Sequence, residues 1–265
     1  MYSLRLKCTP GEVDFISAEL WEAGTAGIRE MDDEDGVVLI AGFETNNERA
    51  ALIERFTRHG AQWKQEEATN WVEETRRAWP AREIGQWIFL APHWCVEETP
   101  AGRIRVVHNP GLACGTGEHP CTQLALAAIE AAEVSGKTVV DVGTGAGLLA
   151  IAALRLGARL AVGVDTDEAA LHATRENFAL NDLPDFLAAG SADCLRDGCA
   201  AVTIANISGT VLLSIADDLL RVSGSGGQLI LSGFTGDELP AIEETIGRGE
   251  ITSCDEWRCL NVPLS

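Results

Sequence analysis

The 265-residue sequence carries 20 lysine and arginine residues against 40 aspartate and glutamate residues, which gives a formal net charge of −20. A surface of this sign repels phosphate backbones, so the composition argues against a nucleic-acid partner and favours either a basic partner or simple solubility. We find no apolar run near the roughly 18 residues of a membrane span and no secretory signal pattern, so we expect no membrane association and a cytoplasmic location.

Eight cysteines are spread along the chain, with no C-x-x-C pair and no histidine at a zinc-ligand spacing. In a chain of this length the pattern is typical of buried thiols rather than of a disulfide framework. We therefore expect no metal site.

The first 70 residues predict a small α+β domain. An alternating strand-like segment, a helical segment, a hairpin that turns at Asp35-Gly36, a second helical segment and a final strand follow one another. This βαββαβ order indicates a ferredoxin-like domain over residues 1–70. Residues 71–108 follow as a connector, and the four tryptophans among residues 70–94 favour a packed segment over a free linker.

Residues 109–265 predict a different architecture. Short β-rich runs such as KTVVDV alternate with helical runs such as GLLAIAALRLGA. This alternation indicates a doubly wound α/β domain with a parallel sheet covered on both faces. In such folds ligands bind at the carboxyl ends of the strands.

A glycine-rich turn follows the first strand of this domain. Gly143, Gly145 and Gly147 form G-x-G-x-G, a spacing associated with S-adenosylmethionine. Read from Gly145 through Ala150, the same turn is G-x-G-x-x-A, a loose dinucleotide match. Glycine spacing alone therefore leaves both cofactors open.

Charge favours the first of these cofactors. Asp141 precedes Gly143 by two residues, and residues 138–154 contain neither lysine nor arginine. A carboxylate there repels a pyrophosphate and attracts a cationic sulfonium. The alternative is that Asp141 only accepts hydrogen bonds from the turn's own amides.

Three further polar residues follow later strands. Asp165, 22 residues after Gly143, can accept hydrogen bonds from the ribose hydroxyls of either cofactor. Asp193 follows the third strand, where it can meet an adenine amino group or serve only as a turn residue. Asn206 ends the fourth strand and can offer its carbonyl oxygen to an N–H, or cap the next helix.

Several segments together resemble one family. NPGLACGTGEHPCTQLAL from Asn109, VVDVGTGAGLLAIAALRLGA from Val139, ANISGTVL and LSGF are similar to the ribosomal protein L11 methyltransferase family, as is the tryptophan-rich connector. The segment 109–122 is the most specific of these, because most class I methyltransferases share the glycine turn. The resemblance covers nearly the whole chain.

The resemblance implies an N-terminal domain that captures ribosomal protein L11 and a C-terminal catalytic domain that uses S-adenosylmethionine. It implies that Thr122, Gly143, Asp165 and Asn206 contact the cofactor. We expect Asn206 also to orient the substrate amine during methyl transfer. The glycines of segment 109–122 predict a loop that becomes ordered over the cofactor.

Three positions depart from the family pattern. Glu118 and Cys121 stand where the family usually has threonine, and Ser208 replaces a larger apolar residue. We expect Glu118 to place an anion near the methyl-transfer site, and His119 to be structural.

The resemblance therefore implies a protein N-methyltransferase that acts on lysine side chains or on the N-terminal amine of L11. The alternatives are the same chemistry on another protein or a small amine, and a binding module of this fold without activity. An NAD-dependent oxidoreductase is disfavoured by Asp141.

Overall fold

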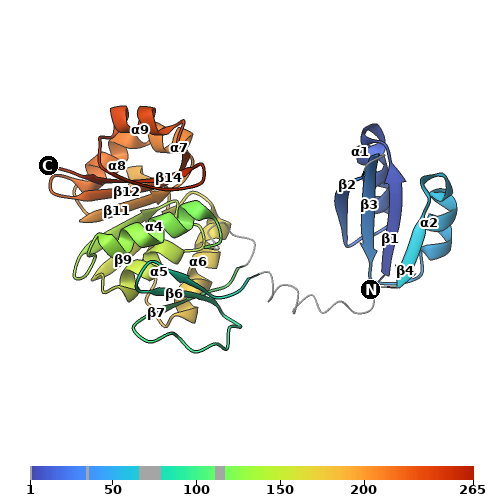
Figure 1. Cartoon of the computed structure of the whole chain (residues 1–265), viewed down its shortest axis with the longest axis horizontal. Helices are drawn as coiled ribbons and strands as arrows, with labels where there is room; N and C mark the ends of the chain where they lie inside the picture. Colours follow the sequence, from blue (N-terminus) through green and yellow to red (C-terminus); the bar gives the residue numbers. More distant parts are fainter. Residues whose placement is uncertain (1, 34–35, 66–78, 111–116) are drawn as a thin grey trace. The chain divides into compact units, whose positions relative to one another are not determined.

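The computed structural model describes residues 2–33, 36–65, 79–110 and 117–265. The chain divides into two compact units, Met1–Thr75 and Arg76–Ser265 (Figure 1). The helices in the described ranges are all too short or too polar to cross a membrane.

The first unit is a four-stranded antiparallel sheet with the order β2-β3-β1-β4 and two α-helices. Leu4 and Leu6 are fully buried while Arg5 and Lys7 are exposed, as expected for a strand with one face on a core. The predicted βαββαβ order and ferredoxin-like arrangement are confirmed, although Asp35 of the predicted turn lies outside the described residues. The elements are β1 (Tyr2–Cys8), α1 (Val13–Glu22), β2 (Gly27–Asp33), β3 (Gly36–Phe43), α2 (Arg49–Arg55) and β4 (Gln62–Gln65), with 3₁₀ turns η1 (Pro10–Glu12) and η2 (Thr57–His59).

Part of the predicted connector folds as a small sheet. Strands β5 (Arg82–Ile84), β6 (Ile88–Pro92) and β7 (Ile104–His108) form it in that order, within the second unit. Trp87 keeps 50% of its surface exposed, so the tryptophans do not all pack inward. The bounds 1–70, 71–108 and 109–265 remain predictions.

The second unit is built on a seven-stranded sheet with the order β10-β9-β8-β11-β12-β14-β13. β14 pairs antiparallel with both β12 and β13, and the other pairings of this sheet are parallel, so the predicted doubly wound, mostly parallel sheet is confirmed. The strands are β8 (Thr138–Val142), β9 (Leu160–Asp165), β10 (Leu187–Ala189), β11 (Val202–Asn206), β12 (Gln228–Thr235), β13 (Glu250–Cys254) and β14 (Trp257–Pro263). The helices are α4 (Pro120–Ala131), α5 (Leu148–Arg155), α6 (Glu168–Leu180), α7 (Gly209–Ser214), α8 (Ala216–Ser223) and α9 (Leu239–Thr245), with the 3₁₀ turn η3 (Ala192–Cys194).

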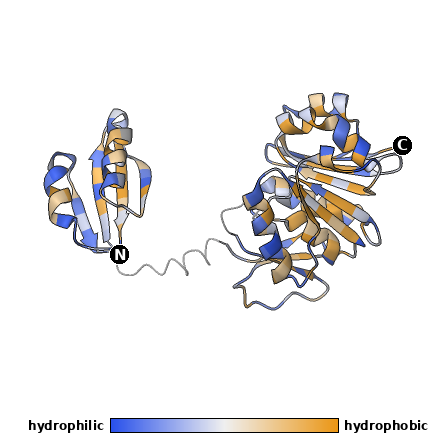
Figure 2. Ribbon diagram, turned by 180° about the vertical axis from the view of Figure 1, so that it is seen from behind, coloured by the Kyte–Doolittle hydropathy of each residue, from blue (hydrophilic) through white to orange (hydrophobic). Residues whose placement is uncertain are grey.

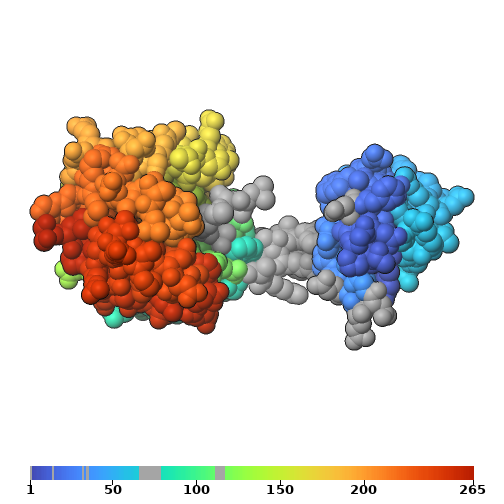
Figure 3. Space-filling model, turned by 90° about the horizontal axis from the view of Figure 1, so that it is seen from above, coloured from blue at the N-terminus to red at the C-terminus, as the bar shows by residue number. Residues whose placement is uncertain are grey.

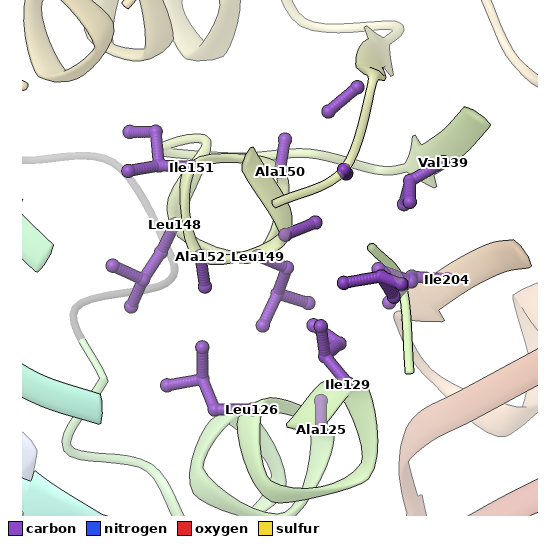
Figure 4. Packing of buried hydrophobic residues seen from close by; sticks show 14 of the residues in the cluster. Ala125, Leu126, Ile129, Val139, Leu148, Leu149, Ala150, Ile151, Ala152 and Ile204 are labelled. Carbon is purple, nitrogen blue, oxygen red and sulfur yellow. The ribbon is translucent and has the colours of Figure 1, made fainter. Parts of the chain in front are cut away.

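Two hydrophobic clusters stabilise this sheet. One involves α4 and α5, where Leu126 and Ile129 lie opposite Leu148 and Leu149 (Figure 4). The other packs beneath α7, α8 and α9. The strands of the large sheet are mostly hydrophobic (Figure 2), and the chain from α7 to β14, orange to red, forms one broad face of the unit (Figure 3).

Strand order determines where a ligand can enter. β8 lies between β9 and β11, and the chain passes from β8 to β9 on one side before returning to β11 on the other. The connections after β8 and β11 therefore diverge and leave a crevice at the carboxyl ends of these two strands. The predicted glycine turn follows β8, and Asn206 ends β11.

Candidate functional site

A cavity of about 780 Å³ lies at this crevice. Gly143 and Gly145 line it from the turn after β8, Asp165 from the end of β9 and Asn206 from the end of β11. Four predicted residues from the ends of three strands are thus brought to one cavity, because parallel strands place their carboxyl ends at the same edge of a sheet.

A second cavity of about 430 Å³ adjoins the first. Both are lined by Gly143, Gly145, Asn206 and Ile207. Only the second is lined by Thr122 and by other residues from the start of α4, and it also reaches β14. The two spaces therefore meet at the glycine turn and Asn206, with room for one ligand on each side.

Asp165 is held rigidly at the wall of the first cavity. Its Oδ2 accepts a hydrogen bond from the Gly145 backbone N at 2.9 Å, and its Oδ1 accepts one from the Asp167 N at 3.0 Å. Each carboxylate oxygen can still accept a further hydrogen bond. The arrangement suits a pair of neighbouring hydroxyl groups.

Asp141 does not line either cavity. Its carboxylate is 1% exposed, and Oδ2 accepts hydrogen bonds from Thr144 Oγ1 at 2.8 Å and from the Ala150 N at 3.2 Å. Oδ1 is buried without a hydrogen-bond partner in the described part of the chain. The geometry therefore matches the alternative in which Asp141 holds the turn together.

Burial raises the pKa of Asp141 to about 6, against the hydrogen bonds from Thr144 and Ala150 that lower it. The ordinary pKa of an aspartate is about 3.9, so between these values the folded protein binds more protons than the unfolded chain. The resulting contribution to the free energy of unfolding is complete below pH ~4 and is lost as the pH rises through 6.

The substitution Asp141→Asn should therefore stabilise the protein at pH 8 more than at pH 4.5. An asparagine oxygen can still accept from Thr144 and Ala150, while the buried charge, whose cost is up to ~3 kcal/mol for a shift of about two pKa units, is removed. Urea unfolding at both pH values measures the difference. Asp237→Asn, at an exposed aspartate, is the control, and an equal gain for Asp141→Asn at both pH values would contradict the assignment.

Gly147 and Asp193 also lie away from both cavities. Gly147 precedes α5 with φ +80°, and a Cβ there would lie 2.6 Å from Thr174 Cγ2, so this glycine allows α6 to pack closely. Asp193 is exposed in η3, although the preceding residues Gly190 and Ser191 line the first cavity. A contact of Asp193 with a ligand remains a prediction.

Asn206 occupies the junction of the two cavities. Its Nδ2 donates a hydrogen bond to Thr122 Oγ1 at 3.1 Å, and its Oδ1 is buried with no partner among the residues described. The N-cap position of the helix after β11 is Ser208 rather than Asn206, so capping does not explain this side chain. A buried carbonyl oxygen without a donor is costly, and a ligand N–H would satisfy it.

The second cavity contains residues that we did not assign to the site. His119 caps α4 and its Nδ1 lies 2.8 Å from Cys121 Sγ, while its ring meets Trp257 edge to face with centroids 4.4 Å apart. A capping role agrees with the structural assignment of His119, but the residue also faces the cavity. Trp257 reaches the second cavity through the pairing of β14 with β12. The local sequence around Trp257 therefore gives no sign of a site.

Asn177 of α6 is a further residue that sequence reasoning missed. It lines the first cavity, its Nδ2 donates to the Ala146 carbonyl oxygen at 2.8 Å, and its Oδ1 accepts from the Asn109 N at 2.7 Å. It thus ties the glycine turn to the start of segment 109–122. Residues 111–116 lie outside the described ranges, so ordering of this loop remains a prediction.

Glu118 does not line either cavity. Its carboxylate forms an ion pair with the guanidinium of Arg82 in β5. Glu118 therefore does not place a free anion near the methyl-transfer site as expected, because its carboxylate is paired with a cation of the small sheet. Ser208, in contrast, does line the second cavity.

The family model, the relatives in sequence and one solved structure indicate the same family. The family model for ribosomal protein L11 methyltransferase (PrmA) matches residues 2–263. The ribosomal protein L11 methyltransferase of Azotobacter vinelandii is 33% identical over 282 residues, covering 96% of each chain. That of Synechococcus elongatus is 35% identical over 192 residues, covering 69% of this chain and 64% of the relative, which is less than two thirds of its length.

A solved structure is also similar. The crystal structure of ribosomal protein L11 methylase from Lactobacillus delbrueckii subsp. bulgaricus has 32% sequence identity and a TM-score of 0.63, covering 70% of this chain and 99% of that one. Because the family model spans almost the entire sequence, the chain belongs to the ribosomal protein L11 methyltransferase family.

Proposed function

We propose that this protein transfers methyl groups from S-adenosylmethionine to amines of ribosomal protein L11, on lysine side chains or at the N-terminus. The observation that carries the proposal is the buried, unpartnered Oδ1 of Asn206 between two adjoining cavities. One cavity suits the methyl donor and the other the amine, and the unpartnered oxygen lies where the two reactants meet.

The first cavity fits S-adenosylmethionine better than a dinucleotide. Its volume of about 780 Å³ lies within the range of ligand pockets, and Asp165 is placed to accept hydrogen bonds from ribose hydroxyls. Among the described residues that line it are Asp167 and Glu176 but no lysine or arginine. Such a wall favours a cation and offers no countercharge to a pyrophosphate. The bound cofactor supplies an electrophilic methyl group on a sulfonium.

The chain's contribution is mainly to position the amine. Asn206 Oδ1 accepts an N–H of the amine, and Thr122 Oγ1 holds Asn206 in that orientation by accepting from Nδ2. With one N–H fixed, the nitrogen lone pair is directed toward the first cavity, and positioning of this kind accounts for much of the rate of a displacement reaction. His119 and Trp257 also line the second cavity.

The amine must also lose a proton. A lysine amine with an ordinary pKa near ~10.4 is mostly protonated at neutral pH, so the second cavity must favour the neutral form. Partial burial among Leu148, Leu149 and Trp257 disfavours the charged ammonium. The proton leaves through water.

L11 as the target is supported by the family to which the chain belongs and by the N-terminal ferredoxin-like unit. The test is incubation of the purified chain with radiolabelled S-adenosylmethionine and ribosomal protein extract from the same organism, followed by mass spectrometry of each labelled band. We expect one labelled band, at L11. Label on another protein would mean that this other protein, and not L11, is the substrate. Cofactor binding without any label would indicate a binding module without activity.

A further inference from the structure

A basic hollow lies on the N-terminal unit, whereas the cavities described above are formed by residues of the second unit. Its volume is about 350 Å³, and Arg5, Lys7, Arg58 and His59 line it together with Gln62 and two uncharged neighbours. The described residues that line it include no aspartate or glutamate. In a chain with twice as many acidic as basic residues, a hollow lined in this way is unexpected.

The hollow arises from the unequal lengths of two neighbouring strands. β4 pairs with β1 only from Tyr2 to Arg5, and its first residue, Gln62, is opposite Arg5. β1 continues to Cys8, so its last residues extend beyond the start of β4. The turn η2 comes alongside this free length of strand and brings Arg58 and His59 next to it.

Two of the cations in the hollow are free of carboxylates. Lys7 pairs with Asp33, but the side chains of Arg5 and Arg58 form no ion pair or hydrogen bond with any residue in the described ranges, and both residues are exposed. Residues 1–75 hold only seven lysines and arginines against sixteen aspartates and glutamates. Two unpaired arginines therefore gather at one place although carboxylates are abundant in the same unit.

His59 provides a second, independent observation. Its side chain is more than nine-tenths buried, and its Nε2 lies 3.6 Å from Glu12 Oε1. Its Nδ1 is buried without a hydrogen-bond partner in the part of the chain that the structure describes. Buried polar atoms are normally satisfied, so an unsatisfied imidazole nitrogen belongs to a residue that lines the same hollow as two unpaired guanidinium groups.

We propose that this hollow is a docking site for an acidic side chain of the protein substrate. A guanidinium binds a carboxylate through two parallel hydrogen bonds, and the hollow is large enough for one such group with its stem. A nucleic acid would bring many phosphates to a unit with an excess of acidic residues, whereas a single carboxylate on a protein engages only the arginines. The inference rests on the proposed function in taking L11 as that protein.

The role that follows is orientation of the substrate. The net charge of −20 attracts a basic protein in any orientation, while a local cationic site binds only the part of its surface that carries a carboxylate. The hollow thus adds specificity to an attraction that is otherwise unspecific.

The test measures binding and methylation separately in the full chain. Arg5→Glu, Arg58→Glu and the double variant are compared with Arg49→Glu, which makes the same charge change at an exposed arginine of α2 outside the hollow. Calorimetry gives the Kd for purified L11 and for S-adenosylmethionine, and a methyl-transfer assay gives kcat and KM. Urea unfolding verifies that each variant is folded.

We expect the double variant to raise the Kd and KM for L11 about tenfold, with kcat and the cofactor Kd unchanged and with Arg49→Glu close to wild type. Arg5→Lys with Arg58→Lys should recover part of the binding. Unchanged L11 affinity in the double variant, or an equal loss of affinity in Arg49→Glu, would overturn the proposal. An RNA oligonucleotide that displaces L11 from the wild type but not from the double variant would also overturn it. Hollow-dependent binding of L11 without methylation would support this site and refute the proposed function instead.

Discussion

Asn206→Ala is expected to lower kcat/KM by about 100-fold or more while leaving the protein at least as stable as wild type. The activity is lost because the amine loses the acceptor that fixes its orientation, and misplacement by about 1 Å is sufficient for a loss of this size. Stability is retained because removal of a buried oxygen that has no hydrogen-bond partner in the described structure offsets the loss of the hydrogen bond from Nδ2 to Thr122. Steady-state kinetics and urea unfolding of the same preparation measure both effects.

A second variant separates positioning from binding. Thr122→Val removes the hydroxyl that accepts from Asn206 Nδ2, so the amide can rotate although its oxygen is still present. We expect an intermediate loss, about tenfold and mainly in kcat, whereas Thr122→Ser keeps the hydroxyl and should be nearly normal. Calorimetric titration with S-adenosylmethionine shows how much of each loss comes from the cofactor. Wild-type kinetics in Asn206→Ala would remove this residue from the mechanism.

The predictable part of the site follows from parallel-strand geometry. Gly143, Asp165 and Asn206 each end or follow a strand, and a doubly wound sheet brings such positions together whatever lies between them. Asp141 was expected beside the cofactor but does not line either cavity, and the reason is local. It is one residue inside the end of the central strand β8, where its side chain reaches the N-terminal turn of α5 instead of the cavity.

The unpredicted part depends on pairings between distant segments. Trp257 reaches the second cavity only because β14 runs back along β12, with a register shift between Ser232 and Phe234. The basic hollow likewise depends on where the pairing of β4 with β1 begins, which places Arg58 near Arg5. Neither the register of a long-range strand pair nor the point at which it ends can be read from local hydrophobic patterns.

Gly233 lies at this register shift, and its replacement by alanine should have a large effect on stability and activity. This residue has φ +89°, a backbone conformation that strains any side chain, and a Cβ there would lie 2.6 Å from the carbonyl oxygen of Ile207 and 2.9 Å from its N and C atoms. These are backbone atoms of the residue after Asn206, so they cannot rotate away. Gly233→Ala should therefore displace the end of β11, costing ~3 kcal/mol or more of unfolding free energy and most of the activity.

The variant Gly226→Ala separates backbone strain from the collision with Ile207 as causes of the expected loss. Gly226 has a similar φ of +77°, but a Cβ there would meet nothing within 4 Å, so this variant experiences the backbone strain without the collision. It should lose only about 1 kcal/mol and keep wild-type kcat/KM, because an isolated left-handed alanine costs about that much. Equal destabilisation of the two variants in urea unfolding would mean that φ alone accounts for Gly233. A larger loss at Gly233, together with a lower kcat, would instead mean that the bulge in β12 leaves space for the backbone that positions Asn206.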